Sequence, residues 1–227
     1  MSLFGKLFGA RKRGSDLPPE VVKIFEKIEH FLIYDDEAQN AALPEPMRKV
    51  IEAGPAVDEL PEAKGEFGRC ITNPVPVNGA VGELAYLSRL VTPSGAGLFG
   101  HRLGHIGKVD VYETVNTDGK TWDIIFLSYY HPRKSRKAPT GYRLSKAGER
   151  PIFITCTNFR VDGFPFPMEA AIRECMRRVL GFPVRPPNVA ELLTSARFVR
   201  TPDQNARLAE MAELGMEPAA SYKDAGG

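Results

Sequence analysis

The sequence predicts an α+β domain with a mainly antiparallel sheet centred on residues 108–130 and helices packed at both ends of the chain. Strand-like segments lie in the middle, whereas helical periodicity occurs before residue 54 and after residue 166. Strands and helices therefore do not alternate as they do in βαβ units, which favours hairpins. Residues 122–130 are apolar at both odd and even positions, which is typical of a central strand covered on two sides.

We expect five parts along the chain. They are a flexible basic and apolar tail (1–16), a helical N-terminal segment (17–53), an α+β core domain (69–200), a C-terminal helix (201–215) and a disordered tail (216–227).

The helical N-terminal segment begins at a proline pair, which suits the first turn of a helix. Apolar residues from Val21 to Leu32 then recur at spacings of three and four, which predicts one buried face. A second short helix over 46–53 ends at Gly54-Pro55, and the acidic stretch 55–68 is predicted to be a linker.

Proline and glycine cluster between residues 54 and 107, and we expect this region to be rich in loops. Two prolines forbid a helix over 71–79. Residues 81–91 fit a short helix slightly better than a strand, and both alternatives stay open. The glycines between 95 and 107 indicate a flexible loop.

The central hairpin is predicted from three signals. Val109, Val111 and Val115 alternate with other residues, as in a half-buried strand. The Asn116–Gly119 stretch predicts a turn with Gly119 in the left-handed conformation. The strand 122–130 follows, and residues 151–157 predict a third strand.

A strong helix is predicted to begin at Pro167. Its buried stripe consists of Met168, Ala171, Ile172, Cys175, Met176, Val179 and Leu180. Two capping-box patterns, which satisfy the first amides of a helix, predict further helices over 189–196 and 202–214.

The most distinctive functional feature is the basic loop, residues 131–150. It carries seven Lys or Arg residues against Glu149 alone, whereas residues 35–66 carry nine acids against three basic residues. Such clustered charge can bind phosphates or carboxylates. The candidate anion-binding residues are Arg133, Lys134, Arg136, Lys137, Arg143 and Lys146. The alternative is that the basic loop pairs within the molecule with the acidic segment.

A second hypothesis is an enzyme, a hydrolase that could depend on a divalent metal. If Val115 pairs with Lys120, then Asp110 and Asp123 become diagonal neighbours on one face of the sheet. Two such carboxylates can divide acid and base duties, with His105 or His131 as a further catalytic candidate. The alternative is that both aspartates face solvent or pair with basic residues.

Other motifs give weaker evidence of a functional site. His101 and His105 have the spacing of two metal ligands on a helix, but the glycines between 100 and 107 argue against a helix there. We therefore predict no metal site and no cofactor. Cys156 and Cys175 lie among apolar residues and are interpreted as core thiols.

Composition points to a cytoplasmic protein. No apolar run reaches the roughly 18 residues of a membrane span, and the three widely spaced cysteines do not form a disulfide framework. Leu3, Phe4, Leu7 and Phe8 precede a basic cluster, so weak attachment to an anionic membrane is a third hypothesis. The leading hypothesis is a non-enzymatic binding protein whose basic loop engages an acidic partner or a polyanion.

Overall fold

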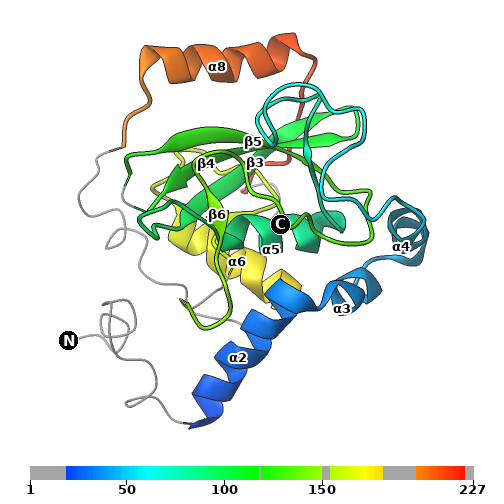
Figure 1. The fold of residues 1–227 in the computed structure, drawn as a ribbon. Coiled ribbons are helices and arrows are strands. Elements are labelled where there is room, and N and C mark those ends of the chain that lie inside the picture. The colour runs from blue at the N-terminus through cyan, green and yellow to red at the C-terminus, as the bar shows by residue number, and fades with distance from the viewer. Residues whose placement is uncertain (1–18, 118, 150–153, 181–197, 223–227) are drawn as a thin grey trace, which may run out of the picture.

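The computed structural model describes residues 19–117, 119–149, 154–180 and 198–222. Over these residues the chain is α+β: one six-stranded sheet has helix α8 on one face and helices α5 and α6 on the other (Figure 1). The helices are α2 (Pro19–Tyr34), α3 (Asp36–Ala41), α4 (Glu45–Glu52), α5 (Gly79–Arg89), α6 (Met168–Leu180) and α8 (Pro202–Glu213).

The sheet has the order β1-β5-β4-β3-β7, and β8 pairs with the same edge of β3 as a sixth strand. The strands are β1 (Val75–Pro76), β3 (Leu98–Ile106), β4 (Val109–Asn116), β5 (Trp122–Ser128), β7 (Cys156–Thr157) and β8 (Glu217–Pro218). A small second sheet joins β2 (Leu90–Val91) to β6 (Arg143–Leu144).

The sheet is mixed, which corrects the prediction of a mainly antiparallel one. The long pairings β3–β4 and β4–β5 are antiparallel, but the two-residue strands β1 and β7 run parallel to β5 and β3. Neither short strand is next to its partner strand in the sequence, so no tight hairpin turn forces the pairing to be antiparallel. The predicted third strand is reduced to β7, and residues 151–153 lie outside the described part.

The central hairpin forms from the predicted residues, although its register differs from the predicted one. Gly119 has a φ of +69°, and its amide donates to the carbonyl of Asn116. The side chain of Asn116 also accepts hydrogen bonds from the amides of Lys120 and Thr121. Strand β5 is covered on both faces: Ile125 and Leu127 enter the larger core, whereas its even-numbered apolar residues enter the smaller core under α8.

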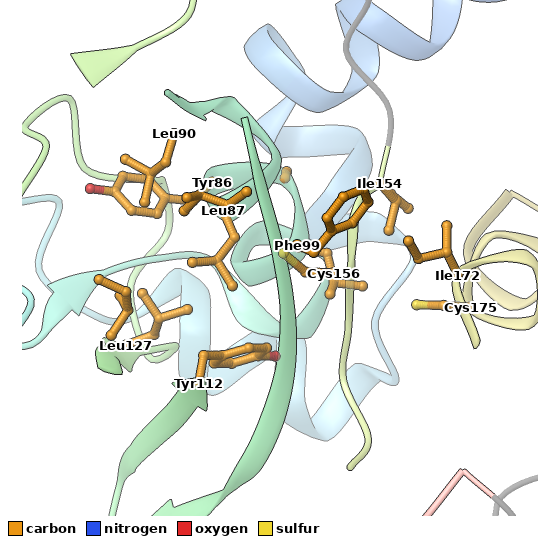
Figure 2. Packing of buried hydrophobic residues seen from close by; sticks show 14 of the residues in the cluster. Tyr86, Leu87, Leu90, Phe99, Tyr112, Leu127, Ile154, Cys156, Ile172 and Cys175 are labelled. Carbon is orange, nitrogen blue, oxygen red and sulfur yellow. The ribbon is translucent and has the colours of Figure 1, made fainter. Parts of the chain in front are cut away.

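The larger core packs α5 and α6 against the sheet. Tyr86 and Leu87 from α5 meet Phe99 and Tyr112 from β3 and β4, and Cys175 reaches the same cluster from α6 (Figure 2). Ile28 and Leu32 of α2 join this cluster as well. Within residues 81–91, which the sequence left open, residues 81–89 belong to helix α5, whereas Leu90–Val91 form strand β2.

Strand β3 was not predicted, because its glycines suggested a loop. Two of them are required by close neighbours: a Cβ on Gly100 would lie 2.9 Å from the sulfur of Cys156, and one on Gly104 would lie 2.1 Å from the carbonyl oxygen of Glu217. Glycine here lets strands β7 and β8 approach β3.

The prediction of a disordered tail from residue 216 is wrong for residues 216–222. The amide of Ala219 donates to the carbonyl of Leu103, and the amide of Tyr222 donates to that of Arg160. The ring of Tyr222 stacks on Phe159. Short strands of mixed composition give little periodic signal, so the sequence pattern did not reveal this segment.

Of the helices predicted over 189–196 and 202–214, only the second lies within the described residues. Helix α8 begins with the predicted capping box, in which Thr201 and Gln204 exchange side-chain and backbone hydrogen bonds. The helix predicted over 189–196 lies outside the described residues, as do the apolar residues 3–8. Within the described residues no helix is both long and apolar enough to cross a bilayer.

Candidate functional site

Three cations of the basic loop are paired with the acidic segment. Arg133 lies 2.6 Å from Asp58, and Lys137 forms an ion pair with Glu59. Lys134 forms a third pair with Asp36 at the start of α3. For these residues, the intramolecular alternative is the one observed, and they do not lie free for a ligand.

Lys134 is a structural cation. Its side chain is 3% exposed, and its ammonium donates to Gln39 Oε1 at 2.9 Å in addition to Asp36. Burial lowers the pKa of Lys134, and the carboxylate of Asp36 opposes this shift. A buried ammonium needs partners of this kind because desolvation disfavours its charge. Its position therefore fixes the loop against α3.

Two further residues pin the same loop. His131 is buried, with Nδ1 2.9 Å from the carbonyl oxygen of Pro55 and Nε2 3.1 Å from Ser128 Oγ. The amide of Ser135 donates to the carbonyl of Pro76. Burial lowers the pKa of His131. With both ring nitrogens engaged, His131 holds the loop and has no free nitrogen for a substrate.

Three further cations of the basic loop, Arg136, Arg143 and Lys146, are partly or fully exposed. Arg136 and Lys146 are exposed, and their side chains make no hydrogen bond or ion pair with the described residues. Arg143 donates to Glu149 and lowers its pKa to about 2. Because such surface ion pairs contribute little to stability, Arg143 can exchange Glu149 for the carboxylate of a partner.

Aromatic rings lie beside these cations. The ammonium of Lys137 lies 5.1 Å from the ring centroid of Phe67, and the guanidinium of Arg69 lies 5.6 Å from that of Tyr142. Both rings are partly exposed. Residues 67–69 thus border the basic loop and add apolar area to its charged surface.

Asp110 and Asp123 do not form the predicted pair. In the observed register Asp110 lies opposite Leu127 and Asp123 opposite Thr114, two residues away from the predicted register. The shift comes from the loop 117–121, which is longer than the turn assumed. The two carboxylates face the same side of the hairpin but are four residues apart along it, or about 13 Å.

Each aspartate instead binds an arginine. Arg102 donates to Asp110 over 2.6 Å, and Arg69 donates to Asp123 over 2.7 Å. Burial raises the pKa of Asp123, although Arg69 partly offsets this. The enzyme hypothesis therefore loses the geometry on which it was based.

The two histidines lie on a strand rather than a helix. His101 is buried, its Nδ1 accepts from the amide of Val161 at 2.8 Å, and its Nε2 lies 2.9 Å from Glu113. His105 is partly exposed, with Glu217 3.6 Å away. Among the described residues no three His, Cys, Asp or Glu side chains gather into a metal site.

Glu113 is the best-satisfied buried carboxylate. Burial alone would raise its pKa, but hydrogen bonds from His101 and Arg200 lower it to about 2. Trp122 also donates to it over 2.7 Å. Arg200 precedes α8, so this carboxylate ties that helix to the sheet. Sequence reasoning had no signal for a contact that spans 87 residues.

The thiols of Cys156 and Cys175 are core residues. Both are buried, and burial raises the pKa of each to about 12. A thiol in this state is a poor nucleophile.

A shallow cleft of about 290 Å³ lies at the outer edge of β5. It is lined by Glu66, Arg69, Cys70, Trp122, Asp123, Ile124 and Arg207. Its arginines are already engaged, Arg69 by Asp123 and Glu66, and Arg207 by Glu210. The volume lies at the lower limit for small-molecule sites, so the surface of the basic loop is the stronger candidate.

Comparison with known proteins adds no functional assignment. A scan against protein-family models found no match, and searches of curated proteins and of solved structures found none either.

Proposed function

We propose that the protein is a non-enzymatic binding protein that engages an acidic partner through the exposed part of the basic loop. The observation that carries the proposal is the way this loop is held. Lys134 and Ser135 are buried and bonded to neighbouring segments, while Arg136 and Lys146 remain exposed without an ion pair among the described residues.

A loop fixed in this way suits binding. Ordering a flexible basic segment on a partner costs conformational entropy, and a loop that folding has already ordered avoids part of this cost. Arg136 directly follows the anchors Lys134 and Ser135, so its backbone is positioned, although its guanidinium makes no hydrogen bond or ion pair with the described residues. The proposal thus depends on preorganised charge rather than on the total charge, which is only +2.

The charge pattern favours an acidic protein segment over a long polyanion. Asp58, Glu59 and Glu149 lie among the loop cations. A nucleic acid places a phosphate every few ångströms and would meet these carboxylates as well as the cations. A protein segment with separate carboxylates can contact the cations alone.

The test is a binding measurement with a labelled octaglutamate peptide at low ionic strength. Replacing both Arg136 and Lys146 by serine should weaken binding by about 3- to 10-fold, since each exposed charge contributes roughly 0.2–1 kcal/mol. The control variant replaces the exposed Lys23 and Lys49 and should bind as the parent does. Failure of the parent to bind, or an equal loss in both variants, would refute the proposal.

A further inference from the structure

Residues 55–59, Pro-Ala-Val-Asp-Glu, lie on the basic loop in the way that a bound peptide lies on a receptor. Their backbone carbonyls accept three hydrogen bonds from loop side chains. His131 Nδ1 lies 2.9 Å from the carbonyl oxygen of Pro55, Arg133 donates to that of Ala56 over 3.0 Å, and Ser135 donates to that of Asp58 over 2.6 Å. This tethered segment, 55–59, is thus held by its main chain.

The acidic side chains of the tethered segment are bound as well. Asp58 Oδ1 accepts from Arg133 at 2.6 Å and from the amide of Arg136 at 2.9 Å. Glu59 pairs with Lys137. The hydrogen bond from Arg133 lowers the pKa of Asp58, and that from Lys137 lowers the pKa of Glu59. Two adjacent carboxylates therefore meet three donors of the basic loop.

These contacts are tertiary. His131 and Pro55 are 76 residues apart in the sequence, and Lys137 and Glu59 are 78 residues apart. The tethered segment forms neither helix nor strand, and all its residues are partly or fully exposed. Nothing in its own local structure requires Asp58 and Glu59 to face the basic loop. None of its side chains belongs to either hydrophobic core, so its contacts with the loop are mainly polar.

We propose that the tethered segment occupies the binding surface as an internal ligand, and that the acidic partner carries an Asp-Glu dipeptide in an extended segment that displaces it. This inference rests on the proposed function and adds the chemistry of the partner. Displacement frees Arg133 and Lys137 beside the already exposed Arg136, whereas Lys134 keeps Asp36 and continues to anchor the loop.

An internal ligand lowers the apparent affinity of the basic loop for a free peptide. A tethered segment competes at an effective concentration in the millimolar range, so a free peptide with the same contacts binds the parent protein weakly. Removing the two carboxylates of the tethered segment removes that competition. The same peptide should then bind more tightly although the receptor loop is unchanged.

The experiment uses a labelled peptide with the sequence of residues 54–61, GPAVDELP, titrated against the full-length protein. We expect Asp58→Asn/Glu59→Gln to bind it at least about 10-fold more tightly than the parent, because the intramolecular competitor is lost. The control Glu52→Gln/Glu62→Gln removes the same charge from exposed residues outside the contact and should bind as the parent does. A peptide with Asn-Gln in place of Asp-Glu should bind none of them.

The single substitution Glu59→Gln tests the same inference with less risk of unfolding the protein. Lys137 and Glu59 are 49% and 36% exposed, so Glu59→Gln leaves the core untouched and should still give a gain of about 2- to 3-fold. Equal affinity of parent and variants, or equal binding of the Asn-Gln peptide, would overturn the internal-ligand inference. If octaglutamate binds the parent and GPAVDELP binds no variant, the inference fails and the proposed function stands. If neither peptide binds any form, both fail.

Discussion

The hydroxyl of Tyr112 donates to Oε2 of Glu83 over 2.9 Å, between strand β4 and helix α5. Both side chains are buried, and the carboxyl of Asp110 lies against that of Glu83. Arg102 holds Asp110 from the neighbouring strand. Burial, together with the charge of Asp110, raises the pKa of Glu83 well above its usual range. The fold therefore favours a protonated glutamic acid at this position.

This arrangement predicts a pH dependence of stability that Glu83→Gln removes. The unfolded chain loses the Glu83 proton near its ordinary pKa of 4.5, whereas the folded protein retains it to higher pH. The stabilisation is thus complete below pH 4.5 and declines as pH rises towards the folded pKa, by up to about 1.4 kcal/mol per pH unit. Glutamine cannot titrate but keeps a similar shape.

Urea unfolding at pH 5, 6, 7 and 8 measures this effect. The difference in free energy of unfolding between parent and Glu83→Gln should shift in favour of the variant as the pH rises from 5 towards the folded pKa of Glu83. Parallel pH profiles for the two proteins would show that Glu83 does not retain its proton.

Two lysines of the basic loop should differ sharply in their effect on stability. Lys134→Ala leaves Asp36 and Gln39 without their cation at a site from which water is largely excluded. We expect the free energy of unfolding to fall by about 2–3 kcal/mol. This is at or below the range for a buried ion pair that loses one partner, because Asp36 is partly exposed. Lys146→Ala, at an exposed position in the same loop, should change stability by less than about 0.5 kcal/mol.

Thermal or urea unfolding of the two variants decides this prediction. If the two variants lose the same free energy of unfolding, Lys134 is not the anchor of the loop, and the preorganisation invoked for binding loses its support.

The sequence predicted those elements whose signals are local. The apolar spacing in α2 and α6, the turn at Gly119 and the capping box at Thr201 depend on neighbouring residues. The two helices, the turn and the cap are confirmed, although Ile24 on the apolar face of α2 is exposed. The charge blocks were also visible in the sequence, together with the alternative that they pair with one another.

The elements that were missed depend on contacts between distant residues. Gly104 indicates a strand only when the carbonyl of Glu217 is known to lie against it. The register of the hairpin was misjudged because the loop length, rather than the strand composition, sets it. The role of Asp58 required the position of Arg133, 75 residues away. Such relationships leave no periodic trace in a single sequence.

The observed register predicts that Asp110 and Asp123 are energetically independent. They lie about 13 Å apart along the hairpin, and each binds its own arginine. In a double-mutant cycle with Asp110→Asn and Asp123→Asn, the changes in unfolding free energy should add within about 0.5 kcal/mol. A larger interaction energy would mean that the carboxylates share a site, as the enzyme hypothesis required.

Gly104→Ala should release the C-terminal segment from the sheet. A Cβ at this position would lie 2.1 Å from the carbonyl oxygen of Glu217, a backbone atom that cannot move without breaking the pairing of β3 with β8. Strand β8 has only two residues, whereas β3 is also held by β4 along its whole length. The strain should therefore be relieved by detachment of β8 rather than by a shift of β3.

Amide hydrogen exchange reports this detachment residue by residue. The amides of Ala219 and Tyr222, which donate to Leu103 and Arg160, should lose protection in Gly104→Ala. The amide of Gly119, in the turn at the far end of the hairpin, should exchange as in the parent. Retained protection at Ala219 would mean that β3 yields instead, and the amides that join β3 to β4 would then exchange faster.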